Sequence, residues 1–186
     1  MKSKPEIIKE IDKNWVQQHF DFDQRDFFIE LLNGRNVEYC LETGFCTGSS
    51  STTTLAICNP KKMISIGMAY NNMDVAKALE ANYNFELLVE NSLRTLNDDF
   101  FEKEFPHGID FYFVDGGHEA PVPLHDLGSS IKYLNDDFII IVDDYHSQSC
   151  PLPDVDSAVD VFIQDTKFSM EPILTNSGKG MAIITE

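Results

Sequence analysis

The segment VEYCLETGFCTGSSST, residues 37–52, decides the fold of this chain. It begins with a short apolar run, passes through a turn that contains Gly44 and Gly48, and ends in a Ser- and Thr-rich stretch suited to a helix start. Glycine lets the backbone turn sharply and approach a ligand closely, while amides at a helix start can face a polar or anionic group. Strand, glycine turn and helix in this order predict an α/β protein with a ligand pocket above the turn.

The spacing of these glycines differs from the common nucleotide-binding motifs. The turn lacks the GxGxxG pattern of dinucleotide-binding folds and the lysine of the GxxxxGK[ST] phosphate loop. Pyrophosphate binding is therefore disfavoured. Because two glycines in a strand-to-helix turn also occur for packing alone, the function has to be inferred from the rest of the chain.

Outside the turn, short apolar runs alternate with longer amphipathic segments, which is typical of a parallel sheet with crossover helices. Turn formers at residues 175–180 separate the last two runs and predict a hairpin. The expected strands are residues 37–41, 63–66, 85–89, 109–114, 138–142, 169–174 and 181–185. The expected helices between them are residues 50–57, 73–81, 92–101, 120–134 and 154–166.

Apolar residues at helical spacing also predict two leading helices, one from Ile7 to Trp15 and one from Phe27 to Leu32. A chain of 186 residues has about the size of one domain, and no linker interrupts it. We therefore expect a single domain, residues 1–186, in which residues 1–34 form the leading helices and residues 35–186 the core.

The composition of the chain limits its partners. A formal net charge of -17 repels a phosphate backbone, so a nucleic acid is not expected as substrate. No apolar run approaches the roughly 18 residues of a membrane span, and the first residues do not resemble a signal peptide. The four cysteines lack the C-x-x-C spacing of zinc motifs. We expect a cytoplasmic protein that acts on a small molecule and does not bind a membrane.

Three acids follow two neighbouring strands of the expected sheet. Asp115 comes directly after one apolar run, and Asp143 and Asp144 end the next. Carboxyl ends of parallel strands share one edge of the sheet, where ligands bind. Crowded carboxylates repel one another unless a cation lies between them, and carboxylates without cysteine favour Mg²⁺ or another hard divalent ion. The residues therefore predict a metal site, and His118 or His146 could accept a proton beside it.

Each of these residues also has a plainer interpretation. Asp143 or Asp144 could cap the turn that follows, His118 could be structural at the start of a helix, and Asp115 could belong to an ordinary turn. The metal site is favoured because both acidic positions fall at the same end of adjacent strands.

Three strings resemble a known family. ETGFCTGSS at residues 42–50 is similar to the first motif of class I S-adenosylmethionine-dependent methyltransferases. FVDGGH at residues 113–118 and IVDDYH at residues 141–146 resemble the small-molecule O-methyltransferases of the cephalosporin-hydroxylase and macrolide-sugar type. The resemblance covers roughly residues 25–186. It implies a Rossmann-like fold with three layers, α/β/α, and a mostly parallel seven-stranded sheet that ends in an antiparallel hairpin.

The same resemblance implies that S-adenosylmethionine binds on the glycine turn, with Glu42 at its amino-acid end and Asn91 and Ser92 at its adenine. It also implies a divalent ion that holds the hydroxyls of the substrate. The expected cofactor-binding residues are Glu42, Thr43, Gly44, Phe45, Gly48, Ser49, Gly67, Met68, Asn91, Ser92 and Asp115. The expected catalytic residues are His118, His146 and Asp115, and the expected metal ligands are Asp115, Asp143 and Asp144.

One position departs from the pattern of the family. The second strand of such enzymes ends in an acid that binds the ribose hydroxyls, yet here Gly67 and Met68 follow the strand. A buried polar group without a partner costs about 1 to 3 kcal/mol, unless water or Asn71 replaces the missing acid.

The sequence favours an S-adenosylmethionine-dependent methyltransferase that methylates a hydroxyl of a small molecule with the help of a divalent ion. Two alternatives fit the same residues. One is a non-catalytic methyltransferase-like binding protein, which Gly67 favours, and the other is a metal-dependent hydrolase that uses the strand-end acids. The chain offers little material for a lid, so a second subunit of a homo-oligomer could complete the pocket.

Overall fold

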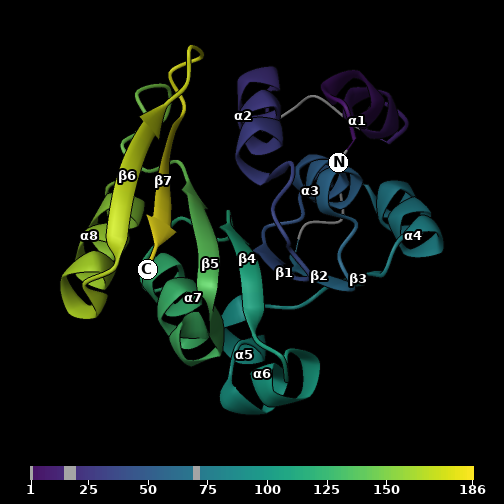
Figure 1. Ribbon diagram of the computed structural model, residues 1–186. Coiled ribbons are helices and arrows are strands. Elements are labelled where there is room, and N and C mark those ends of the chain that lie inside the picture. Colours follow the sequence, from purple (N-terminus) through teal and green to yellow (C-terminus); the bar gives the residue numbers. More distant parts are fainter. Residues whose placement is uncertain (1, 15–19, 69–71) are drawn as a thin grey trace.

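The computed structural model describes residues 2–14, 20–68 and 72–186, and its described strands form one sheet. The strand order is β3-β2-β1-β4-β5-β7-β6 (Figure 1). All neighbours pair in parallel except β5 with β7 and β7 with β6, which are antiparallel. The strands are β1 (Tyr39–Thr43), β2 (Lys62–Ile66), β3 (Phe85–Leu88), β4 (Ile109–Val114), β5 (Leu134–Asp143), β6 (Ser169–Leu174) and β7 (Gly180–Thr185).

Helices cover both faces of this sheet. Helices α2, α3 and α4 contribute to the apolar core on one face, and α6, α7 and α8 contribute to the core on the other. The helices are α1 (Lys4–Ile11), α2 (Phe22–Leu32), α3 (Ser49–Cys58), α4 (Met73–Asn82), α5 (Ser92–Thr95), α6 (Asp98–Glu104), α7 (Val122–Ser130) and α8 (Pro153–Thr166), with a 3-10 turn at Ile131–Tyr133. The expected α/β/α layers and terminal hairpin are confirmed.

The strand β4 shows why the sheet is buried on both faces. Phe111 and Phe113 pack into the core beneath α2 and α3, while Tyr112 and Val114 pack into the core beneath α7 and α8. Side chains of a strand alternate between the two faces, so a continuous apolar run supplies both cores at once.

Several expected boundaries were wrong, and local hydrogen bonds explain one of them. The helix expected at residues 92–101 is two helices, because the side chain of Asn97 accepts a hydrogen bond from the Phe100 amide and starts α6 anew. The helix expected at residues 120–134 is shorter, because α7 ends at Ser130 and a short 3-10 turn follows it. Trp15 and Asn71 lie outside the described residues.

The order of the strands positions a site. Strand β1 lies between β2 and β4, so the chain leaves the carboxyl ends of β1 and β4 toward opposite sides of the sheet. Such a switch point leaves a crevice at the sheet edge, where α/β proteins bind ligands. Within the described parts of the chain, no helix has both the length and the hydropathy needed to cross a membrane.

Candidate functional site

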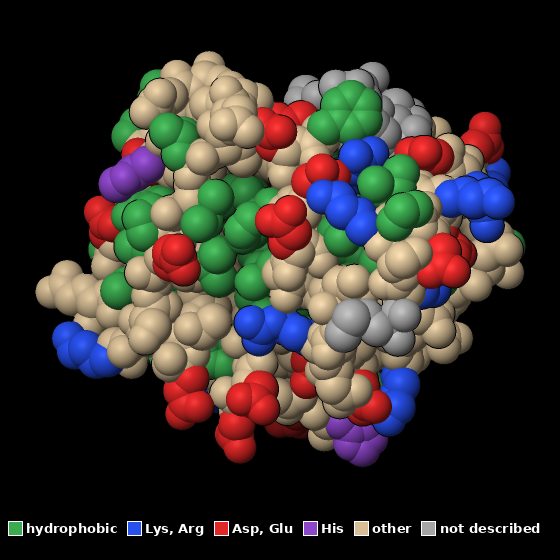
Figure 2. All heavy atoms as spheres, turned by 45° about the horizontal axis from the view of Figure 1, so that its top comes forward, with side chains coloured by type: hydrophobic (Ala, Val, Ile, Leu, Met, Phe, Trp, Pro, Cys, Tyr) green, Lys and Arg blue, Asp and Glu red, His purple; other side chains and the backbone are tan. Residues whose placement is uncertain are grey.

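A cavity of about 550 Å³ opens at the carboxyl ends of the parallel strands, a volume within the roughly 300–1,000 Å³ of small-molecule pockets. Figure 2 turns this end of the molecule forward and shows hydrophobic side chains near the centre with acidic side chains around them. We divide the lining into two parts. The glycine half comprises Thr43, Gly44, Phe45, Cys46, Ile66, Gly67, Met68, Glu90, Asn91 and Ser92. The acidic half comprises Asp115, Gly116, Gly117, His118, Val122, Asp143, Asp144, Ser149, Cys150, Leu152 and Lys179.

The glycines of the turn are required by the protein's own backbone. Gly44 has a φ of +100°, and a Cβ atom there would lie 1.7 Å from the carbonyl oxygen of Asp115. Gly48 has a φ of +77° and precedes α3, and a Cβ atom there would lie 2.6 Å from the ring of Phe45. The turn can therefore lie against the end of β4 only because residue 44 has no side chain.

Glu42 stands behind the cavity wall and not in it. Its fully buried carboxylate accepts hydrogen bonds from the hydroxyls of Ser50, Ser51 and Ser65, which joins β1 to α3 and β2. Burial raises the pKa of Glu42 to about 7, although the three serines oppose this shift. Like Glu42, Gly48 and Ser49 do not line the cavity, so the structure does not bring these three expected residues to it.

The end of β2 carries no acid where the family pattern would place one, and the space there is tight. A Cβ atom on Gly67 would lie 3.0 Å from the backbone nitrogen of Phe45, because the glycine turn folds over this position. The next residue, Met68, is 64% exposed and offers an apolar side chain to the cavity. A side chain at residue 67 would therefore require the glycine turn to shift by a few tenths of an ångström.

The loop after β3 brings three polar side chains to the glycine half. Asn91 caps α5, since its Oδ1 accepts a hydrogen bond from the Leu93 amide at 3.0 Å. Glu90 Oε2 accepts a hydrogen bond from Thr95 Oγ1 at 2.9 Å. Asn91 and Ser92 line the cavity as expected, while the sequence analysis missed Glu90.

Two buried polar groups lie side by side under the cavity wall. A Cβ atom on Gly116 would be 2.9 Å from Asp126 Oδ2 and 3.3 Å from Thr43 Oγ1. Thr43 Oγ1 and both carboxylate oxygens of Asp126 make no hydrogen bond of normal geometry with a described residue. Burial raises the pKa of Asp126 to about 6, and the nearby hydroxyls of Ser92 and Thr43 oppose this shift. Buried polar atoms of this kind are usually satisfied by water or by a ligand.

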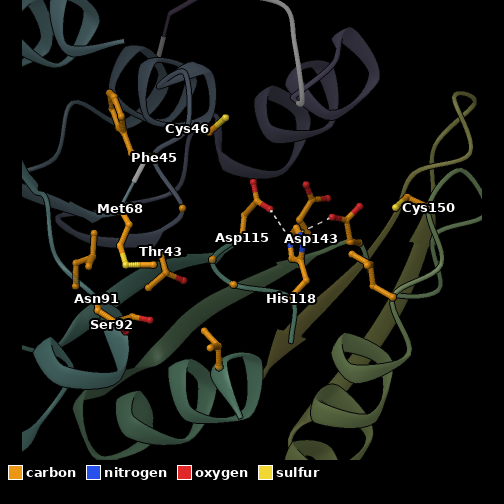
Figure 3. A pocket seen from close by; sticks show the side chains of 18 of the residues that line it. Thr43, Phe45, Cys46, Met68, Asn91, Ser92, Asp115, His118, Asp143 and Cys150 are labelled. Carbon is orange, nitrogen blue, oxygen red and sulfur yellow. Dashed lines mark ion pairs between the residues drawn. The ribbon is translucent and has the colours of Figure 1, made fainter. Parts of the chain in front are cut away.

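In the acidic half, His118 lies between two carboxylates. Its Nε2 atom is 3.5 Å from Asp115 Oδ1 and 3.5 Å from Asp144 Oδ2 (dashed lines in Figure 3). One ligand atom from each of these three residues falls within 4.8 Å of the others, which is compact enough for a metal ion. The residues that the structure gathers are thus Asp115, His118 and Asp144, while Asp143, the third expected ligand, lines the same cavity outside this group.

Asp143 lines the same cavity, but its side-chain hydrogen bond comes from helix α2. Its Oδ1 accepts a hydrogen bond of 2.7 Å from Nε2 of Gln24, a fully buried residue of α2. Burial, together with the neighbouring charges of Asp115 and Asp144, raises the pKa of Asp143 well above its ordinary value.

Other charges in the acidic half respond to the same crowding. Burial raises the pKa of Asp115, and the contact with His118 opposes the shift. The pKa of His118 is raised in turn, chiefly by Asp115. Lys179 lowers the pKa of Asp115 and of Asp143, so the terminal hairpin contributes a positive charge to this half.

The hairpin turn is fastened to the loop that follows β5. The carbonyl of Gly178 accepts hydrogen bonds from the amides of Gln148 and Ser149, at 2.9 and 3.1 Å. The hydroxyl of Ser177 donates to Asp21 Oδ2 at 2.6 Å, which also ties the turn to the start of α2. Three segments that are distant in sequence therefore meet around the strand-end acids.

His146 is not brought to the cavity. It is exposed, its ring stacks on Tyr145 with 4.1 Å between the ring centroids, and its backbone amide donates to Asp156 Oδ1. Of the two histidines expected near the acids, only His118 lines the cavity, and it has carboxylates within reach.

The sequence analysis missed several residues that complete the site. Gln24 had a local signal, because Asp21 and Gln24 form a capping box at the start of α2, but nothing near it in sequence pointed to Asp143. Lys179 and Cys150 had no signal, since they reach the cavity through the hairpin and its loop. The assembled site offers backbone and apolar contacts on one side, and groups that can hold a cation or accept a proton on the other.

Comparisons with known proteins follow this geometry. A family model described as a methyltransferase domain matches residues 41–145, more than half of the chain, and no curated protein matches. Among solved structures, an O-methyltransferase from Bacillus cereus in complex with SAH (S-adenosylhomocysteine) has a TM-score of 0.72 at 14% identity, covering 100% of this chain and 93% of its own.

Two further structures are similar. An SAH-bound methyltransferase from Podospora anserina has a TM-score of 0.72 at 12% identity, covering 98% of this chain and 88% of its own. A putative caffeoyl-CoA O-methyltransferase from Staphylococcus aureus has a TM-score of 0.68 at 17% identity, covering 100% and 93%. Identities this low show a shared fold.

Proposed function

Because the chain belongs to the methyltransferase domain family, we propose that it transfers the methyl group of S-adenosylmethionine to a hydroxyl of a small molecule, assisted by a divalent cation. The observation that carries this proposal is a single cavity in which the glycine turn faces the strand-end acids. The alternatives of a non-catalytic binding protein and of a metal-dependent hydrolase gain no support from the comparisons.

The glycine half fits the cofactor. Phe45, Ile66 and Met68 offer apolar surface for an adenine, Ser92 offers a polar group, and the turn presents backbone at Gly44. When bound, S-adenosylmethionine supplies an activated methyl group. The role proposed for Glu42 becomes indirect, because its three serine bonds hold the turn in shape and leave it outside the lining.

The acidic half fits the methyl acceptor. Two carboxylates and an imidazole, from Asp115, Asp144 and His118, are ligand types that Mn²⁺ or Mg²⁺ accepts. A cation at this group would lower the pKa of the acceptor hydroxyl and orient its oxygen. Asp143, which Gln24 holds beside the group, adds negative charge that favours a cation.

A second mode of proton removal is supported by the same contacts. His118 Nε2 lies 3.5 Å from each of two carboxylates, which would stabilise the imidazolium formed when His118 accepts the proton of the acceptor hydroxyl in the absence of a cation. The same nitrogen, Nε2, cannot both coordinate a cation and accept the proton, so the two modes exclude each other.

Calorimetry tests the proposal in two steps. We expect SAH and S-adenosylmethionine to bind the wild-type protein at micromolar concentrations, and the absence of heat with both would overturn methyl transfer. Titration with Mn²⁺, followed by electron paramagnetic resonance, then separates the modes. We expect Asp144→Ala to weaken Mn²⁺ binding at least tenfold, while the exposed control Asp165→Ala on α8 leaves it unchanged. A wild-type protein that binds SAH but no Mn²⁺ would leave His118 as the base.

A further inference from the structure

The cofactor proposed above carries a ribose diol, and the position at the end of β2 that usually supplies its carboxylate partner is Gly67 in this protein. Gly67 has no side chain, and a Cβ atom there would make a tight contact of 3.0 Å with the backbone nitrogen of Phe45. Within the described lining of the glycine half, Glu90 is the carboxylate that the structure supplies.

Pairing of β3 with β2 places Glu90 beside Gly67. Ile66 pairs with Leu88 in parallel register, and the amide of Gly67 donates to the Leu88 carbonyl at 3.0 Å. Glu90 follows Leu88 by two residues, so it leaves the sheet edge next to Gly67 and Met68. All three residues line the same cavity.

The carboxylate of Glu90 contacts a residue of α5. Its Oε2 accepts the hydrogen bond from Thr95 Oγ1, and Thr95 is a buried residue of α5 whose hydroxyl also contacts the Asn91 carbonyl at 3.1 Å. The side-chain oxygen of Asn91 is engaged in capping α5. A buried threonine hydroxyl, whose one proton is shared between the Glu90 carboxylate and the Asn91 carbonyl, thus contacts an exposed carboxylate at the cavity wall.

We propose that Glu90 binds the ribose hydroxyls of S-adenosylmethionine, in place of the acid that β2 lacks. A carboxylate accepts hydrogen bonds through both oxygens, so one side chain can take both hydroxyls of a vicinal diol. The inference rests on the proposed function and adds a cofactor contact from the neighbouring strand. It would give the ribose a carboxylate partner although residue 67 is a glycine.

Calorimetry with two ligands tests this role. We expect Glu90→Ala to weaken SAH binding about tenfold, and to change the affinity for the 2′-deoxy analogue of SAH much less. If the carboxylate and the hydroxyl are partners in one contact, removing either one abolishes the same interaction, and removing both weakens binding little more than removing one. Because Glu90 is exposed, the variant is expected to fold, which thermal unfolding checks. The matched control is Glu86→Ala, an exposed acid on β3 outside the cavity, which should bind SAH like the wild type.

Each outcome bears on a different statement. Equal SAH affinity of Glu90→Ala and the wild type would overturn the role of Glu90 while leaving methyl transfer intact. If the effect of Glu90→Ala disappeared with an N6-dimethyl analogue of SAH but persisted with the deoxy analogue, Glu90 would contact the adenine amino group. That result would also overturn the role of Glu90. A wild-type protein that binds no SAH would overturn the proposed function, and this role with it.

Discussion

The two halves of the cavity are built in opposite ways. The glycine half is formed around one contiguous turn, whose shape depends on backbone contacts such as that between Gly44 and Asp115. The acidic half gathers like charges from two strand ends. Helix α2 contacts one of these acids, and the terminal hairpin is hydrogen-bonded to the loop after β5 and to the start of α2. Sterics within a short segment can therefore set a pocket floor, whereas a cluster of charge depends on groups that are far away in sequence.

The largest effect is expected in the glycine half. Gly44→Ala forces a Cβ atom to within 1.7 Å of the Asp115 carbonyl, at a φ that side chains rarely adopt. We expect strain and overpacking to lower the free energy of unfolding by about 3 to 5 kcal/mol. Urea denaturation measures the change.

The matched control for this variant is Gly128→Ala. Gly128 lies in α7 with nothing within 4 Å of its added Cβ atom, so alanine should stabilise the helix by about 0.5 to 1 kcal/mol. If both alanine variants proved as stable as the wild type, the backbone contact would not determine the shape of this half.

The second effect depends on pH. The pKa of Glu42 is about 7 in the folded protein, compared with an ordinary value of 4.5, so the folded state holds the proton more tightly. Glu42 therefore contributes stability that is fully present below about pH 4.5 and lost as the pH rises to 7. We expect the stability of the wild type relative to Glu42→Gln to fall by about 3 kcal/mol across this range.

Denaturation at several pH values between 4.5 and 8 measures this difference. Other buried acids, such as Asp126, titrate in both proteins and cancel in the comparison. Parallel stability curves for the two proteins would show that Glu42 is ionised throughout, and that its serine bonds outweigh its burial.

The smallest effect probes how the acidic half depends on a distant segment. Gln24→Leu removes the hydrogen bond to Asp143 and one bond of the capping box of α2. We expect Mn²⁺ affinity to fall about tenfold, equivalent to about 1.4 kcal/mol, because groups that orient metal-site residues have effects of this size. Electron paramagnetic resonance measures free Mn²⁺ directly.

Asn97→Ala is the control for Gln24→Leu. It removes the cap of α6, at a cost in stability of about 1 kcal/mol, but touches no residue of the acidic half. An equal loss of Mn²⁺ affinity in both variants would assign the effect to general destabilisation rather than to Asp143.

The fold was accessible from the sequence because its signals are local. An apolar run such as Ile109–Val114 is buried on both faces, and the turn formers at residues 175–180 join two strands, so the strands and the hairpin were predicted. Helix boundaries were less accessible. A single side-chain bond from Asn97 splits a helix, and no periodicity of apolar residues reports it.

The candidate site was accessible only in part, for a related reason. Asp115, Asp143 and Asp144 were found because they end apolar runs, but the grouping of His118 with Asp115 and Asp144 depends on loop geometry. Gln24 is 119 residues from Asp143 in sequence, and a pattern in one segment cannot indicate such a contact. Thr43 to Cys46 of the turn line the cavity, whereas Glu42, Gly48 and Ser49 do not, and the sequence of the turn does not indicate which of its residues face inward.

The bond between Ser177 and Asp21 joins residues 156 positions apart in sequence. Because a chain is synthesised from its amino end, α2 and the strand-end acids leave the ribosome well before the hairpin turn does. Until residue 177 emerges, Asp21 has no tie to the turn, and Lys179 cannot yet offset the charge of Asp143. The acidic half is thus among the last parts of the molecule to be completed during translation.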